Sequence, residues 1–303
     1  MSNVHAVNRR EFVLGVAAAG VATAVPGIAR AEGEPFKLKY APHGGHFRHS
    51  AGNDIVSQIE FAADLGFRAW EDNGMKGRSV AEQERMAKVM QQRGVEMGVF
   101  VGAATGFNEP TLASGDAAKR EKFLAEIRES VEVAKRVNAQ WMTIVPGAVE
   151  PRIQPDYQLA HVVESLKQAA VILEPHGLVM VLEPLNFRDH PNLVLTEIPQ
   201  AYLVCKAVDS PSCKILFDIY HQQITEGNII PNIDDAWDEI AYFQVGDVPG
   251  RKEPTTGEIN YRNIFRHLHA KEFEGIVGME HGKSLDGVAG EKALVEAYRK
   301  VDA

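Results

Sequence analysis

The sequence is poor in cysteine, and it lacks the short glycine and cysteine motifs that mark several common enzyme classes. Among its 303 residues the only cysteines are Cys205 and Cys213, which excludes a disulfide-rich scaffold and any Cys-x-x-Cys redox or zinc motif. No Gly-x-Gly-x-x-Gly turn follows an apolar segment, so a dinucleotide-binding domain has no sequence signature here. The two cysteines are interpreted either as a disulfide pair in an oxidising compartment or as two buried apolar side chains.

The apolar run at residues 15–25 is too short to be a stable membrane anchor. It follows the pair Arg9 and Arg10, and an Ala-Arg-Ala motif comes after it at residues 29–31. This order of charged, apolar and small residues predicts a twin-arginine signal peptide over residues 1–31. We therefore expect the twin-arginine export machinery to carry the protein to the periplasm or otherwise out of the cytoplasm.

Basic residues are outnumbered by acidic ones. The whole chain has a net charge of −9, and residues 32–303 alone contain 29 basic and 40 acidic residues, a net charge of −11. An acidic protein of this kind lacks the basic surface that nucleic acids and anionic membranes attract. The expected partner is a small-molecule substrate, and the sequence is also compatible with a homo-oligomer.

From residue 36 onward, short apolar runs alternate with longer segments of helical period, without an intervening linker. We expect eight strands, at residues 36–41, 67–71, 95–101, 140–145, 178–183, 213–218, 240–245 and 275–280. Runs such as 178–182 are apolar on both faces, which is typical of a parallel sheet covered by helices. Residues 32–303 are thus predicted to form an α/β fold, a single (β/α)8 TIM-barrel domain with about 34 residues per unit. An open doubly wound sheet is the alternative.

Four successive predicted strands have a residue with a side-chain oxygen at their end, or one residue before it, at Glu183, Asp218, Gln244 and Glu280. The carboxyl ends of all strands in a parallel barrel open onto one face, so these side chains are expected to meet. Three converging carboxylates repel one another unless a cation compensates them. The sequence therefore predicts a site for a divalent metal ion held by these four residues.

The predicted ligand set consists of three carboxylates and one amide oxygen, with no thiolate. Ligands of this type favour a hard ion such as Mn²⁺ or Mg²⁺ over structural zinc. Four protein ligands leave two positions of an octahedral shell for substrate oxygens, and a hydroxy-carbonyl compound offers two such oxygens. We expect the substrate to be a small molecule of this class.

Three segments carry a resemblance to a known family. Residues 183–186 (Glu-Pro-Leu-Asn), 217–221 (Phe-Asp-Ile-Tyr-His) and above all 244–261 (Gln-Val-Gly-Asp-Val-Pro-Gly-Arg-Lys-Glu-Pro-Thr-Thr-Gly-Glu-Ile-Asn-Tyr) resemble the hydroxypyruvate isomerase family of xylose-isomerase-like TIM barrels. The resemblance covers roughly residues 140 to 282. It implies a metal-dependent isomerase that converts hydroxypyruvate to tartronate semialdehyde through an enediolate.

The resemblance also implies roles for individual residues. Glu183 and Glu280 would be the catalytic acid–base pair in addition to binding the metal, and His221 and Arg251 would hold substrate oxygens. Ketose 3-epimerases of the wider group carry a substrate-binding acid six residues after the first glutamate, and Asp189 stands at that position here.

Other functions remain open at this stage. Returning the proton to the opposite face of the same carbon gives epimerisation, so an exported ketose or keto-sugar 3-epimerase, or a barrel that processes keto-glycosides, is the main alternative. A sugar-binding barrel without catalysis is the non-enzymatic one. His43, His46 and Trp70 are expected at the mouth of the barrel, the histidines as metal ligands or polar loop residues and Trp70 as a pocket wall or a barrel plug.

Overall fold

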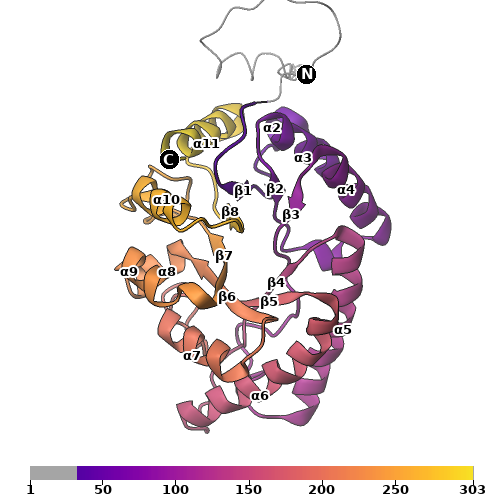
Figure 1. Ribbon diagram of the computed structural model, residues 1–303, viewed down its shortest axis with the longest axis vertical. Helices are drawn as coiled ribbons and strands as arrows, with labels where there is room; N and C mark the ends of the chain where they lie inside the picture. The colour runs from indigo at the N-terminus through magenta and orange to yellow at the C-terminus, as the bar shows by residue number, and fades with distance from the viewer. Residues whose placement is uncertain (1–32, 303) are drawn as a thin grey trace, which may run out of the picture.

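The computed structural model describes residues 33–302, so the predicted signal peptide at residues 1–31 lies outside the described part of the chain. Figure 1 shows a ring of short strands around a central axis, with the helices arranged outside the ring. Most of the chain alternates strand and helix, as the βα pattern of the sequence predicts. The described residues form a TIM barrel.

Each of the eight predicted segments contains a strand. The strands are β1 (Lys39–Ala41), β2 (Ala69–Trp70), β3 (Glu96–Met97), β4 (Trp141–Ile144), β5 (Val179–Leu182), β6 (Cys213–Asp218), β7 (Ile240–Gln244) and β8 (Ile276–Gly278). The α-helices are α2 (Arg48–Ala51), α3 (Ile55–Asp64), α4 (Val80–Arg93), α5 (Ala117–Val137), α6 (Pro155–Leu173), α7 (Ile198–Val208), α8 (Ile219–Thr225), α9 (Ile229–Asp235), α10 (Tyr261–Ala270) and α11 (Gly287–Val301).

Pairing of the first strand with the last closes the sheet and excludes the open doubly wound alternative. Six strands form one parallel ladder in the order β1-β8-β7-β6-β5-β4, and β2 pairs with β3. Isolated parallel bridges join the two parts, between His43 and Glu71 on one side and between Val101 and Thr143 on the other. Strands β2 and β3 are shorter than predicted because single β-bridges, and not continuous ladders, join them to the rest of the sheet.

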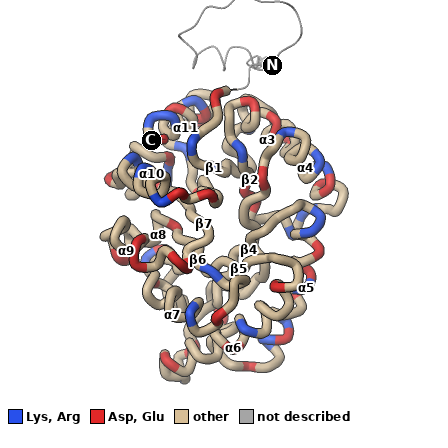
Figure 2. The backbone as a smooth tube through the Cα atoms, in the orientation of Figure 1, with Lys and Arg blue, Asp and Glu red and all other residues tan. Residues whose placement is uncertain are grey.

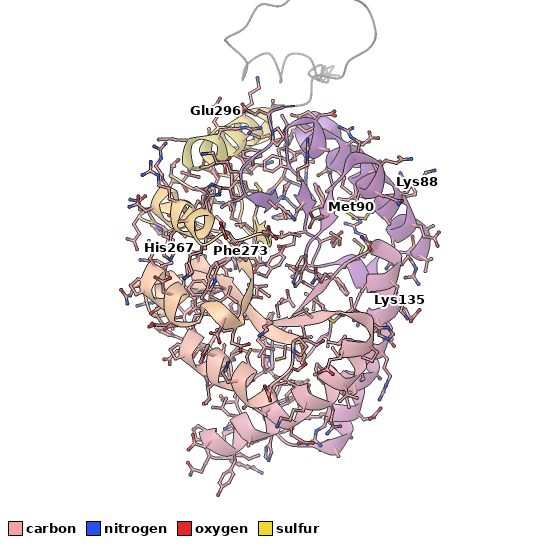
Figure 3. The ribbon with its side chains drawn as sticks, viewed as in Figure 1. Lys88, Met90, Lys135, His267, Phe273 and Glu296 are labelled. Atoms are coloured by element: carbon pink, nitrogen blue, oxygen red, sulfur yellow. The ribbon has the colours of Figure 1, made fainter. Side chains whose placement is uncertain are left out.

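The outer helices begin and end at sequence signals of the expected kind. In α4, Ser79 and Glu82 form a reciprocal capping box, and Gly94 ends the helix in the left-handed conformation with φ of 61°. Figure 3 shows Lys88 and Lys135 on the outer side of the helical layer, whereas Met90 points toward the sheet. Helix α4 therefore covers the barrel with its apolar face and leaves its charged face in water.

The interior of the barrel is filled by a small apolar layer separate from the large core between sheet and helices. It consists of Ala41, Ala69, Val99, Val181, Leu216, Tyr242 and Ile276, all fully buried. Because this layer plugs the barrel, functional side chains can gather only in the bowl above it, at the carboxyl ends of the strands.

Cys205 in α7 and Cys213 in β6 are both buried free thiols. A hydrogen bond between their side chains, together with burial, raises the pKa of the Cys205 thiol well above its usual range. This environment matches the interpretation of two buried apolar side chains, and it brings the two sulfur atoms close together. Within residues 33–302, no helix has the length and apolar character needed to cross a membrane.

Acidic and basic positions alternate around the helical ring in Figure 2, without a large region of one sign. In this view neither sign of charge gathers over one part of the ring.

Candidate metal centre and active site

The four predicted metal ligands lie together at the carboxyl ends of neighbouring strands. Asp218 ends β6 and is paired in register with Gln244 at the end of β7, which in turn is paired with Gly278 in β8. Glu183 follows β5 directly, and Glu280 comes two residues after β8. Parallel register places these side chains side by side at one rim.

Burial makes it unfavourable for the glutamates of this cluster to carry negative charge. Glu183, Asp218 and Gln244 are 6%, 1% and 1% exposed. Burial, reinforced by the charges of Glu280 and Asp218, raises the pKa of Glu183 well above its ordinary value. The pKa of Glu280 is raised to about 7, mainly by burial and partly offset by Arg251. Glu183 and Glu280 therefore need positive charge nearby to be ionised at neutral pH.

Arg251 provides part of that charge. Its Nη2 atom lies 2.7 Å from Glu280 Oε2 and 3.0 Å from Asp218 Oδ2, and its Nε donates to the backbone oxygen of Glu280 at 3.0 Å. The guanidinium also stacks over the ring of Tyr220, 4.7 Å from the centroid. Arg251 thus lies directly at the carboxylate cluster, and its role in holding substrate oxygens stays a prediction.

His221, in the first turn of α8, points its Nε2 atom into the same cluster. This atom lies 3.5 Å from Asp218 Oδ2 and 3.9 Å from Glu183 Oε1, and the ligating atoms of the three residues all lie within 4.8 Å of one another. Its Nδ1 accepts a hydrogen bond from the backbone N–H of Asn186 at 3.2 Å. Burial lowers the pKa of His221 to about 4, so the ring is neutral at neutral pH.

These two facts fix the tautomer of His221. A neutral imidazole whose Nδ1 accepts a hydrogen bond carries its proton on Nε2. The Nε2–H group therefore points into the site as a donor, and a nitrogen that carries a proton is not free to bind a metal ion. Although His221 lies within the acidic cluster, its geometry fits a hydrogen bond to a substrate oxygen better than metal ligation.

The residues present fit a hard divalent cation. Gln244 Oε1 is buried and has no hydrogen-bond partner among the described residues, and the same is true of His221 Nε2. An unpaired buried amide oxygen costs free energy unless a ligand completes it. Together with the carboxylates of Glu183, Asp218 and Glu280, this oxygen forms a donor set of the type that Mn²⁺ and Mg²⁺ prefer.

Asp189 lies beside the cluster, on the exposed loop that follows β5. Its Oδ2 accepts hydrogen bonds from the Tyr220 hydroxyl at 2.7 Å and from the Asn186 side chain at 3.0 Å. These bonds lower the pKa of the Asp189 carboxyl. Asp189 is thus linked to both Arg251 and His221 through their neighbours, and a direct contact with substrate stays a prediction.

Several residues that complete the site were not assigned a role from the sequence. Asn73 donates from Nδ2 to Glu280 Oε1 at 2.9 Å, and Glu71 accepts from Gln244 Nε2 at 2.8 Å. Both residues follow the end of β2, just as the four predicted ligands lie at or after the ends of their strands. This position is the sequence feature from which a role in the site could have been predicted. Asn186, which holds His221, stands in one of the segments that carry the family resemblance.

His43, His46 and Trp70, which were expected at the mouth of the barrel, contact the backbone or the apolar core. His46 Nε2 donates to the backbone oxygen of His281 at 2.8 Å, and His43 Nδ1 donates to that of Gly44 at 2.9 Å. Both histidines are therefore loop residues bonded to backbone carbonyls and not ligands of the acidic cluster. Trp70 is fully buried and packs in the large core between sheet and helices, apart from the layer that fills the barrel interior.

The fold is a TIM barrel, and its bowl carries buried carboxylates, an unpaired amide oxygen and a neutral histidine at one rim. These groups suit a divalent cation. Residues 59–301 match the family model described as xylose isomerase-like TIM barrel, and the chain belongs to this family.

Two curated relatives are isomerases by name. The 2-oxo-tetronate isomerase of Pectobacterium atrosepticum is 32% identical over 54% of this chain and 63% of its own length. The hydroxypyruvate isomerase of Escherichia coli is 30% identical over 57% of this chain and 67% of its own length. The chain thus matches about two thirds of the length of these relatives.

Among solved structures, the 3-keto-D-glucoside 4-epimerase of E. coli superposes with a TM-score of 0.72. It is 18% identical, and the match covers 87% of this chain and all of that one. At this identity the likeness shows a common fold.

Proposed function

We propose that this protein is a metal-dependent isomerase of a small hydroxy-carbonyl compound, of the hydroxypyruvate isomerase type. The observation that carries the proposal is the meeting of Glu183, Asp218, Gln244 and Glu280 at one rim, with Arg251 and the Nε2 of His221 directed at the same point. The names of the two curated relatives, which act on 2-oxo-tetronate and hydroxypyruvate, agree with this substrate class.

Glu183, Asp218, Gln244 and Glu280 would hold the cation, Mn²⁺ or Mg²⁺. When bound, the cation would supply electrostatic stabilisation of the negative charge that develops on neighbouring substrate oxygens. The three carboxylates also become easier to ionise beside a cation, which removes the repulsion that their burial otherwise creates.

Glu280 and Glu183 would move the proton. A carboxylate can accept a proton from carbon and return it, and the Glu280 carboxylate lies at the shared rim, ion-paired with Arg251 at 2.7 Å. In the isomerisation of hydroxypyruvate, one glutamate would remove a proton from carbon 3, and a proton would return to carbon 2. The hydroxyl proton on the carbon 3 oxygen would pass to the carbon 2 oxygen, so that tartronate semialdehyde forms with atoms and charge balanced and without any further reactant.

His221 and Arg251 would position the substrate. The Nε2–H of His221 can donate to the oxygen on which charge develops, and Asn186 keeps it in that orientation. The guanidinium of Arg251 offers several donors in a planar fork, which suits the carboxylate of a hydroxy acid. Asp189 would contact a hydroxyl at the outer end of the substrate.

A ketose or keto-sugar epimerase is the second candidate. The predicted export signal favours it, because a sugar derivative is a more natural substrate outside the cytoplasm than hydroxypyruvate. The same two glutamates would then remove and return the proton on opposite faces of one carbon. A sugar-binding barrel without turnover would keep the bowl but would exchange no substrate proton.

The deciding experiment is proton exchange in heavy water. Protein loaded with Mn²⁺ is incubated in D₂O with hydroxypyruvate, 2-oxo-tetronate, ketoses and keto-sugars, and deuterium uptake is followed by NMR. We expect uptake at the carbon next to the carbonyl, and the product identifies isomerase or epimerase. Absence of exchange with every substrate would contradict an enzymatic function of this type.

We also propose that residues 1–31 direct export through the twin-arginine pathway. The proposal is supported by the Arg9–Arg10 pair and the apolar run that follows it. A fusion of residues 1–40 to a reporter should reach the periplasm, and the double change Arg9→Lys and Arg10→Lys should retain it inside. Equal export of both fusions would overturn this proposal.

A further inference from the structure

Glu71 is a buried carboxyl that the reaction proposed above does not use. It follows β2, is 1% exposed, and lies inside the barrel just below the acidic cluster. Its Oε1 accepts a hydrogen bond from Gln244 Nε2 at 2.8 Å, and its Oε2 accepts one from the Tyr242 hydroxyl at 3.0 Å. Strands β2 and β7 are not neighbours in the sheet, so these bonds cross the barrel interior.

The barrel is shaped to admit this carboxyl. A Cβ atom added to Gly278 in β8 would overlap Glu71 Oε2, and a Cβ atom added to Gly98 would overlap the hydroxyl of Tyr242. Both glycines thus leave the space in which the Glu71 and Tyr242 side chains lie. Residues from several strands therefore combine to place a carboxylate against the Gln244 side chain.

The contact decides which end of the Gln244 amide faces the cluster. An amide has an NH₂ group at one end and an oxygen at the other, and only the oxygen can bind a hard cation. Both oxygens of Glu71 act as acceptors, Oε1 from Gln244 Nε2 and Oε2 from the Tyr242 hydroxyl, so Glu71 pairs with the NH₂ end of the amide. The oxygen of Gln244 is then the end of the amide that does not face Glu71, and it is buried without a hydrogen-bond partner among the described residues. Asp218 is the register partner of Gln244 on the neighbouring strand.

We infer that Glu71 is a positioning residue of the metal centre, which fixes the side-chain amide of Gln244 with its oxygen directed at the cation. This inference rests on the proposed metal-dependent function. Outer contacts of this kind commonly change metal affinity by roughly ten- to hundredfold when they are removed.

The test introduces Glu71→Gln into the wild-type protein and into the Gln244→Glu variant, and it measures the dissociation constant for Mn²⁺ by titration calorimetry. The change should affect Mn²⁺ binding in opposite directions in the two proteins. With Gln at residue 244, Glu71→Gln should weaken Mn²⁺ binding by roughly tenfold, because an amide at residue 71 no longer selects the NH₂ end of Gln244. In the Gln244→Glu background, the same change should strengthen binding, because a glutamine at residue 71 can donate to the new carboxylate while a glutamate repels it.

The matched control is Tyr242→Phe, which removes the other hydrogen bond to Glu71 and leaves the one to Gln244. It should change Mn²⁺ affinity by less than about twofold. A weakening as large as that of Glu71→Gln would show that Glu71 only supports barrel packing and would overturn the inference. An effect of the same sign in both backgrounds would overturn it as well.

Two further outcomes are separable. If Glu71→Gln does not fold, the Gln244→Glu protein is compared with the double variant Glu71→Gln, Gln244→Glu. The inference is rejected if the double variant does not bind Mn²⁺ more tightly than the Gln244→Glu protein. If the wild-type protein binds neither Mn²⁺ nor Mg²⁺, the proposed function fails and the inference fails with it. Binding by the wild type without the reversal rejects the inference alone.

Discussion

The guanidinium of Arg251 and the carboxylate of Glu280 form a 2.7 Å ion pair at the rim of the barrel. This contact keeps the guanidinium beside the proposed substrate site.

Arg251→Ala should lower kcat/KM for a hydroxy acid by about ten- to hundredfold, the equivalent of roughly 1.5–3 kcal/mol for a charged hydrogen bond. The loss for a neutral ketose should be much smaller, because a hydroxyl lacks the charge that the guanidinium recognises. Steady-state kinetics on both substrates checks this, with Arg251→Lys as the charge-retaining control, and equal losses would argue against an acid substrate.

Removal of the metal ion should abolish activity and lower thermal stability together. The carboxylates of Glu183, Asp218 and Glu280 lose their compensating charge, and a ligand at a hundredfold excess over its dissociation constant contributes about 2.7 kcal/mol to folding. After EDTA treatment and again after addition of Mn²⁺ or Mg²⁺, differential scanning calorimetry measures the stability and an assay of substrate turnover measures the activity. Full activity in excess chelator would refute metal dependence.

The affinity for Mn²⁺ should fall as the pH decreases below about 7. Burial raises the pKa of Glu280 to about 7 from an ordinary value of 4.5, so without metal the carboxyl is protonated at lower pH and must lose its proton when a cation binds. One such proton gives about a tenfold loss of affinity per pH unit. The raised pKa of Glu183 acts in the same direction.

Titration calorimetry in buffers of different ionisation enthalpy measures this proton release directly. Glu280→Gln should release fewer protons than the wild type at about pH 6. A dissociation constant that does not vary between about pH 5.5 and 8 would contradict the linkage between proton and metal.

Glu280→Gln should stop the incorporation of solvent deuterium into substrate, with a loss of about 10²- to 10⁴-fold in rate. An amide keeps the shape and an oxygen for the cation but cannot accept the proton. Glu258→Gln, a change at an exposed glutamate in the segment before α10, is the matched control and should exchange at the wild-type rate. NMR of the reaction in D₂O gives the rates, and unchanged exchange would remove Glu280 from the role of base.

Gly278→Ala should destabilise the protein and displace Glu71. The added methyl group overlaps Glu71 Oε2 in a fully packed interior, where overpacking costs about 1–3 kcal/mol. Gly77→Ala is a suitable control because nothing lies within 4 Å of a Cβ atom at that exposed position. Urea denaturation should separate the two variants, and equal free energies of unfolding would show that the interior has spare room.

Local patterns were sufficient to predict the strand positions and the four side chains at the rim. The predicted strand at 213–218 has the same ends as β6, and the segment at 240–245 differs from β7 by one residue. In a parallel barrel all strands point the same way, so a residue that ends an apolar run is placed at the common rim by its position in the chain. Asp218 and Gln244 were found for this reason.

The contacts that orient those side chains depend on tertiary structure. Glu71 meets Gln244, and Asn73 meets Glu280, across 173 and 207 residues of sequence. Local periodicity carries no information about such pairs, because strand tilt and barrel closure decide which side chains face each other inside the ring. The sequence by itself determined which residues reach the rim, whereas the closed barrel decided which oxygen and which nitrogen each of them presents there.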